Sequence, residues 1–211
     1  MEISQYFIEL RKLFERLPGI GPRQANRFIW ALLDFDADSQ KKLGQAILDL
    51  PMHMQRCTVC FRVFPIQNSE KVCSFCAENT SKDKSKIMVL EHDSDLLNIE
   101  KTKIYSGLYH VLGGPLDPLE EHSAVRNHIK ALYERVLTFS ELQKNGEIIL
   151  ALSPTKLGEF TAEYIKKVLE PLLGGKTPKL KITRLGRGLS TGIELEYADE
   201  LTLKQAMDNR K

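Results

Sequence analysis

Cysteine is scarce in this sequence, long hydrophobic runs are absent, and neither sign of charge prevails. The 211 residues include only four cysteines, whereas a disulfide-stabilised secreted scaffold is usually short and cysteine-dense. No apolar run approaches the length needed to cross a bilayer, and residues 1–6 lack the basic start and apolar core of a signal peptide. We therefore expect a cytoplasmic protein in a compartment that keeps thiols reduced.

The overall charge is too small to identify a partner. The chain carries 30 Lys and Arg residues against 28 Asp and Glu, which leaves a formal net charge of +2. A nucleic-acid partner would therefore have to be recognised by local clusters of cations. The apolar content of 42% is typical of a globular protein with one medium domain or two small ones.

All four cysteines fall within one short segment. Cys57 and Cys60 form one Cys-x-x-Cys pair, Cys73 and Cys76 form a second, and residues 61–72 separate the pairs. This spacing is typical of a structural zinc site, in which four thiolates bind one tetrahedral ion. Two disulfides are the alternative. We expect zinc in a closed structural site, because four thiolates leave no coordination position open for catalysis.

The residues before the cysteines follow a helical pattern. Apolar side chains recur at helical spacing over residues 3–16, and Pro22 favours the start of a second helix that runs to about residue 33. A third helix is expected over residues 39–49, and Pro51 should limit its extension. The Gly-rich segment 17–21 joins the first two helices as a hairpin.

The residues after the cysteines alternate between strand and helix patterns. A charged connection over residues 82–86 leads into the first strand. The expected strands cover residues 87–90, 103–105, 109–112, 147–152 and 179–184. The expected helices cover residues 93–100, 122–144, 161–169 and 200–210. Strands separated by helices favour an α/β fold, with a mostly parallel sheet and helices on both faces.

The hairpin has the composition of a phosphate-binding helix-hairpin-helix. Gly19 and Gly21 let the backbone turn closely, so that amide groups and the start of the second helix can face a phosphate oxygen. Arg23 and Arg27 add positive charge. Such contacts would bind DNA, single-stranded, double-stranded or gapped, without reading its sequence. A plain helical turn and a dimer surface are the alternatives.

Carboxylates gather where the strand over residues 87–90 ends. Glu91 follows this strand directly, and Asp93 and Asp95 come next. Ligand groups in open α/β sheets lie at this end of the strands, and such carboxylates could hold Mg²⁺. A polar loop that caps the next helix, with Asp93 or Ser94 as N-cap, is the alternative.

Three further stretches carry weaker signals. His110 lies among apolar residues, which favours a structural role over a catalytic one. The loop over residues 153–159 could bind phosphate, but it lacks the ending of a P-loop. A basic stretch near the C-terminus could bind phosphate or form a solvated edge strand. Its cations are Lys179, Lys181, Arg184 and Arg187.

Taken together, these motifs resemble the RecR family of bacterial recombination mediators. The motifs that carry the resemblance are Leu17-Pro-Gly-Ile-Gly21 with Arg23 and Arg27, the four cysteines, Val89-Leu-Glu91, residues 105–114, Ser153-Pro-Thr155 and residues 194–200. They cover essentially the whole chain. The most specific are Gly107-Leu-Tyr-His-Val-Leu-Gly-Gly114 and Glu196-Tyr-Ala-Asp-Glu200.

The resemblance implies four modules. These are a helix-hairpin-helix domain over residues 1–54, a four-cysteine zinc module over 55–80, a Toprim-like α/β domain over 81–178, and a C-terminal strand and helix for subunit contacts over 179–211. Members of the family are similar in forming homo-oligomeric rings, dimeric or tetrameric, that encircle DNA. They work with a RecO-type partner to load recombinase onto gapped DNA, and the resemblance implies no catalytic activity.

The sequence departs from the family pattern in one informative loop. The family usually has Asn-Pro-Thr-x-Glu-Gly-Glu, whereas this chain has Ser153-Pro-Thr-Lys-Leu-Gly-Glu159, with Leu157 in place of the first Glu. Ser190 replaces a typical proline, which is a small change. A metal-dependent Toprim nuclease or primase-like enzyme that uses the carboxylates around Glu91 is the competing function, and a protein adaptor is a third. A divalent-metal site built only on Glu91 would have too few carboxylates.

Overall fold

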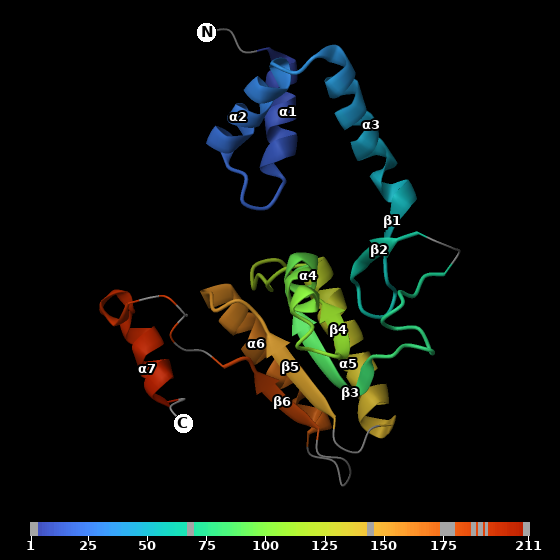
Figure 1. Ribbon diagram of the computed structural model, residues 1–211, viewed down its shortest axis with the longest axis vertical. Coiled ribbons are helices and arrows are strands. Elements are labelled where there is room, and N and C mark those ends of the chain that lie inside the picture. The colour runs from blue at the N-terminus through green and yellow to red at the C-terminus, as the bar shows by residue number, and fades with distance from the viewer. Residues whose placement is uncertain are drawn as a thin grey trace. The chain divides into compact units, whose positions relative to one another are not determined.

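The computed structural model describes residues 4–66, 70–142, 146–173, 180–186, 189, 192 and 194–208. The chain divides into two compact units, residues 1–54 and residues 55–211 (Figure 1). None of the helices in the described ranges is long and apolar enough to span a membrane.

The N-terminal unit contains three helices. They are α1 (Gln5–Glu15), α2 (Pro22–Leu33) and α3 (Ala37–His53). Helix α1 begins after Ser4, whose hydroxyl accepts a hydrogen bond from the Phe7 amide. Pro22 occupies the first turn of α2, as predicted. The Phe14 and Phe28 rings, 5.7 Å apart, hold α1 against α2.

Helix α3 is longer at both ends than the sequence pattern predicts. It begins after Asp36, whose carboxylate accepts a hydrogen bond of 2.9 Å from the Ser39 amide. The expectation that Pro51 limits the helix is wrong, since the helix continues to His53. Pro51 has no amide to donate, but it lies in the last turn, and the next donor bond, from the Met54 amide to the Leu50 carbonyl, is made.

The C-terminal unit is built on a four-stranded sheet. Its strands are β3 (Asp83–Leu90), β4 (Gly107–Val111), β5 (Glu147–Ala151) and β6 (Lys181–Arg184). The strand order is β4-β3-β5-β6, and every neighbouring pair is parallel. A separate two-stranded sheet pairs β1 (Met54–Arg56) with β2 (Val63–Pro65). The predicted α/β class and parallel sheet are confirmed.

Helices cover both faces of the large sheet. Alternate residues of β3 point to opposite faces, and Ile87 and Val89 pack in one buried cluster with apolar residues of α5 (Ala124–Leu142) and α6 (Lys156–Leu169). Met88 and Leu90 pack in a second cluster with Leu96 of α4 (Asp93–Thr102). The sheet is therefore a buried layer between helices, and the buried carboxylate of Glu91 follows the carboxyl end of β3.

Three boundaries in this unit differ from expectation. Residues 103–105 form no strand, because Lys103 takes the left-handed conformation that ends α4, with φ of 56°. The charged residues 82–86 largely belong to β3, where Lys86 pairs in register with Glu147 of the neighbouring strand. Helix α6 begins at Lys156 rather than residue 161.

Short helical elements flank β6 in the chain. The 3-10 turn η1 (Glu170–Leu172) precedes this strand, and the 3-10 turn η2 (Leu195–Tyr197) and the helix α7 (Glu200–Asp208) follow it. The predicted C-terminal helix is therefore present. Lys179, Arg187 and Ser190 lie outside the described residues.

Candidate functional site

The hairpin between α1 and α2 is open at the surface. Gly19 has φ of 78°, a conformation that side-chain-bearing residues rarely adopt, and a Cβ atom at Gly19 or Gly21 would meet nothing within 4 Å. Gly21 is the N-cap of α2 and provides no side-chain cap. The amide groups of the first turn are therefore available to an acceptor from outside, which is the geometry of a phosphate site.

The two arginines of the hairpin share one face of α2. Arg23 and Arg27 are one turn apart and both exposed, whereas Ala25 and Ile29 face the interior of the unit. Helix α2 contains no acidic residue, so its exposed face is positive. The structure thus brings the predicted phosphate-binding residues together on one surface.

The four cysteines converge on one point. The Sγ atoms of Cys57, Cys60, Cys73 and Cys76 all lie within 4.8 Å of one another. A tetrahedral zinc ion with Zn–S bonds of about 2.3 Å places its sulfurs about 3.8 Å apart. The Cys60 and Cys73 sulfurs are 3.6 Å apart. The donor set therefore fits a tetrahedral metal ion.

Backbone amides support the cysteine cluster. The amides of Val59 and Cys73 each donate to the Cys57 sulfur at 3.4 Å. Hydrogen bonds from neighbouring thiols, first from Cys60, lower the pKa of Cys57, while the reciprocal bond with Cys57 raises the pKa of Cys60. Four thiols at this distance cannot all ionise alone, because like charges repel. A divalent cation would remove that conflict.

The cysteine module is attached to the large sheet. The Val111 amide, at the end of β4, donates to the Cys60 carbonyl at 2.8 Å. Phe61 stacks on His128 of α5 with ring centroids 4.0 Å apart, and its backbone takes φ of 61°. These contacts tie the first cysteine pair to both β4 and α5. Asp93 adds a third link, because it accepts from the Val63 amide at 2.7 Å.

The three carboxylates at the end of β3 have separate partners. Glu91 is 4% exposed and accepts two hydrogen bonds from Ser153, from the amide at 3.0 Å and from the hydroxyl at 2.6 Å. Asp95 accepts from the His92 amide at 2.9 Å, so His92 is the N-cap of α4, and the expectation of Asp93 or Ser94 there is wrong. Within the described ranges, the cysteines form a converging ligand group and these carboxylates do not.

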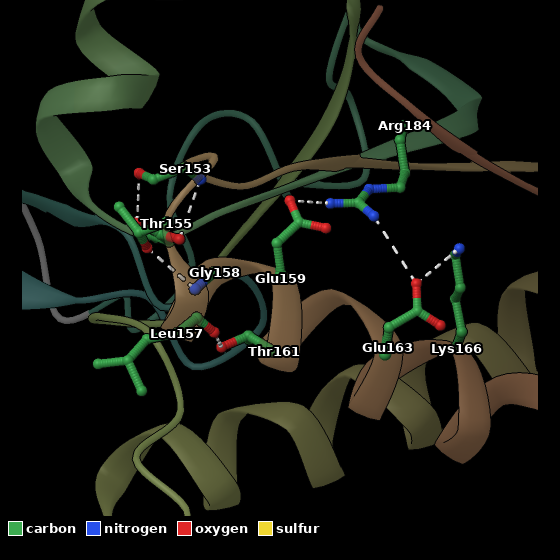
Figure 2. Close-up of polar contacts among 10 residues, drawn as sticks. Ser153, Thr155, Leu157, Gly158, Glu159, Thr161, Glu163, Lys166 and Arg184 are labelled. Atoms are coloured by element: carbon green, nitrogen blue, oxygen red, sulfur yellow. Dashed lines mark hydrogen bonds and ion pairs between the residues drawn. The ribbon is translucent and has the colours of Figure 1, made fainter. Parts of the chain in front are cut away.

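The loop that departs from the family pattern is closed by internal contacts (Figure 2). Thr155 caps α6 by accepting from the Gly158 amide at 3.1 Å. Glu159 forms an ion pair of 2.7 Å with Arg184 of β6, and Arg184 also lies 3.7 Å from Glu163. Arg184 therefore neutralises acidic groups of α6. Lys181 remains exposed.

His110 is a structural residue. It is fully buried, and burial lowers its pKa to about 3, with a smaller contribution from the charge of Arg135. The ring is therefore neutral, and Nε2 must donate to the His128 carbonyl, 3.0 Å away, because a carbonyl can only accept. Sequence reasoning missed Arg135 and His128, since both contact the cysteine module only through the tertiary fold.

Comparisons with known proteins cover nearly all of the chain. The RecR helix-hairpin-helix family matches residues 8–50, the Toprim domain family matches 85–186, and the RecR C-terminal family matches 188–211. The chain is 37% identical over 202 residues to "Recombination protein RecR" of Cutibacterium acnes, covering 96% of this chain and 93% of that protein. It is 36% identical over 210 residues to the protein of that name from Staphylococcus aureus strain MRSA252, covering 100% and 98%. These matches confirm the resemblance in the sequence.

Proposed function

Because this chain belongs to the RecR family of recombination proteins, we propose that it is a DNA-binding mediator of recombinational repair that performs no chemistry itself. In this function the hairpin binds the DNA backbone, and the Toprim-like half recruits partner proteins. The mediator assists the loading of recombinase onto gapped or single-stranded DNA, together with a RecO-type partner.

The observation that carries the DNA-binding proposal is the hairpin surface. Arg23 and Arg27 are exposed on one face of α2, beside the uncapped first turn at Gly21. The net charge of +2 gives little long-range attraction, so affinity must arise from such local groups. Phosphate contacts of this kind carry no sequence information. Binding should therefore depend strongly on salt and weakly on base sequence.

The test is a salt titration of DNA affinity. R23A/R27A should weaken binding equally for unrelated sequences and reduce the slope of log K against log salt by about two, one for each lost phosphate contact. The matched control is K41A/K42A, which removes two exposed lysines of α3 in the same unit. An unchanged slope in R23A/R27A, with an altered oligomeric mass, would make the hairpin a subunit surface instead.

The cysteine cluster supports a structural zinc site. Cys57, Cys60, Cys73 and Cys76 would supply four thiolates to one zinc ion, which would give the module the folding energy that its small core lacks. Freshly purified protein should contain one zinc ion per chain by elemental analysis. A content well below this in protein never exposed to chelator would count against the site.

A homo-oligomer is supported by the apolar surface of the N-terminal unit. A hollow of ≈ 800 Å³ lies among α1, α2 and α3, with Leu13, Phe14 and Ile47 in its wall, and Ile47 is 64% exposed. Leu13 and Leu33, which also line the hollow, are exposed as well, and apolar side chains gathered at the surface mark interaction sites. We propose a second copy of the chain as its occupant. Solution mass with and without gapped DNA tests this, and a concentration-independent monomer would refute it.

The absence of catalysis is testable at the carboxylates. Two-metal phosphoryl transfer needs carboxylates that can clamp both reacting oxygens, whereas Glu91 accepts from Ser153 and Glu159 pairs with Arg184. The protein should not cleave DNA in Mg²⁺. Reproducible cleavage that disappears in E91Q would establish the competing enzymatic function.

A further inference from the structure

Arg135 connects three parts of the C-terminal unit. It lies on α5, and its Nη1 group donates to the Tyr109 carbonyl of β4 at 2.6 Å. Its Nη2 group lies 3.8 Å from the Cys76 sulfur, within hydrogen-bonding range for sulfur. One planar guanidinium group on α5 thus contacts both strand β4 and a cysteine of the metal cluster.

The contact with Tyr109 occurs at an open edge of the sheet. Within the part of the chain that the structure describes, β4 pairs only with β3, so it is an edge strand. Residues 109 and 111 present their backbone groups to the same side, since residues two apart in a strand are equivalent. The Tyr109 carbonyl accepts from Arg135, and the Val111 amide donates to the Cys60 carbonyl. Arg135 and the cysteine module therefore close the outer edge of β4 together.

The contact with Cys76 is an electrostatic one. A zinc ion held by four thiolates has a net charge of −2, because each thiolate carries one negative charge. Among the described residues, Arg135 is the cation that hydrogen-bonds to a cluster sulfur. Cys76 is also the least buried of the four cysteines. A charge-assisted N–H···S bond there both stabilises the thiolate and fixes its direction.

We propose that Arg135 is a positioning residue of the metal centre, which orients the Cys76 thiolate and anchors the centre to the edge of β4. The proposal rests on the zinc site argued above. It predicts that metal affinity depends on a residue that is not a ligand and lies 59 positions from Cys76 in the sequence.

The experiment compares R135Q with a matched control. K130Q removes the same charge from the same helix at an exposed position. Zinc affinity is measured by competition with a chromogenic chelator, on full-length protein loaded with zinc. R135Q should bind zinc about 10–100-fold more weakly, which is the usual effect of losing a residue that supports a metal ligand. K130Q should match the wild type.

A second measurement distinguishes two roles of Arg135, orienting the Cys76 thiolate and closing the edge of β4. Unfolding is followed for zinc-loaded and metal-free forms of each variant. If Arg135 only closes the edge of β4, R135Q will destabilise both forms equally and leave zinc affinity unchanged, which would overturn the proposal. If it positions Cys76, the zinc-loaded form will lose more stability than the metal-free form.

R135K and the zinc content of the wild type give two further tests of the proposal. Should R135Q not fold, R135K provides the same comparison, because it keeps the charge but loses the planar fork that reaches both acceptors. Its zinc affinity should also fall, and wild-type affinity in R135K would overturn the proposal. Wild-type protein that binds no zinc would refute the zinc site itself, and this proposal with it.

Discussion

At the scale of single residues, the loop before α6 closes only because position 158 has no side chain. A Cβ atom on Gly158 would lie 2.0 Å from the Ser153 carbonyl and 2.9 Å from a Glu91 carboxylate oxygen. Real contacts of this length do not occur, so any larger residue must displace the loop. Gly158 thus holds Ser153 in position to donate to Glu91.

G158A should therefore destabilise the C-terminal unit, although alanine is normally the better helix former. The expected loss is about 1–3 kcal/mol, the range for an overpacked site. The control is G44A in α3, where a Cβ atom would meet nothing within 4 Å; that change should stabilise by up to about 1 kcal/mol. Chemical unfolding followed by far-UV circular dichroism measures both, and equal effects would contradict the clash.

The hydrogen bond from Ser153 to Glu91 also contributes to stability. S153A removes the hydroxyl that donates to buried Glu91 at 2.6 Å, so the carboxylate would lose part of its solvation. A hydrogen bond to a charged group contributes about 1.5–3 kcal/mol, and S153A should lower the free energy of unfolding by that amount. A double-mutant cycle with E91Q measures the coupling. S106A, at an exposed serine of the same unit, is the control.

At the scale of elements, local chemistry decided which boundaries the sequence could predict. Helix α2 runs from Pro22 to Leu33 as predicted, because proline and the flanking glycines act on their immediate neighbours. The expected strand over residues 103–105 does not form. The sequence pattern favoured a strand, but Lys103 ends α4 in the left-handed conformation and its amide donates to the Glu100 carbonyl.

The same distinction between local and tertiary causes applies to the candidate sites. Cysteine spacing predicts convergence because each Cys-x-x-Cys pair is local and the donor chemistry is specific. The Glu91–Ser153 contact joins residues 62 positions apart, and no periodicity in the sequence predicts it. Arg135 looks like an ordinary solvated residue of α5 until the fold places it against Cys76.

The turn between α1 and α2 gives a prediction at this scale. G19A forces a side chain into φ of 78° and should destabilise the N-terminal unit by about 1–2 kcal/mol. Trp30, the only tryptophan of the chain, lies in α2, so its fluorescence reports unfolding of this unit. G21A is the control, because φ there is −92° and space is open. A shift in G21A as large as in G19A would contradict the backbone argument.

At the scale of the whole molecule, two compact units allow metal removal to act on one of them. The cysteine cluster lies in the unit formed by residues 55–211, whereas Trp30 lies in the other. Metal binding contributes directly to folding energy when the ligands converge only in the folded state. Loss of metal should therefore destabilise the C-terminal unit selectively.

Chelation, or C60S, should lower the thermal midpoint seen by circular dichroism while leaving the Trp30 fluorescence transition in place. Hydrogen exchange should accelerate at Val111 and along β4, which the cysteine module covers, and stay unchanged in α1 and α2. A parallel fall in both transitions would mean that the two units unfold together. No change in either would mean that the metal contributes nothing to stability.

The strand order β4-β3-β5-β6 differs from the chain order, and this difference determines which sheet edges are open during synthesis. The central strand β3 is synthesised first, and β4 follows it closely, so this pair can form while β5 is still unmade. The nascent pair then has two unpaired edges, which are sites of misassociation between chains. The cysteines have already emerged, and the bond from Val111 to Cys60 can cover part of the outer edge of β4 at once. The Arg135 contact on that edge must wait for α5, and the β3 edge must wait for β5 to leave the exit tunnel.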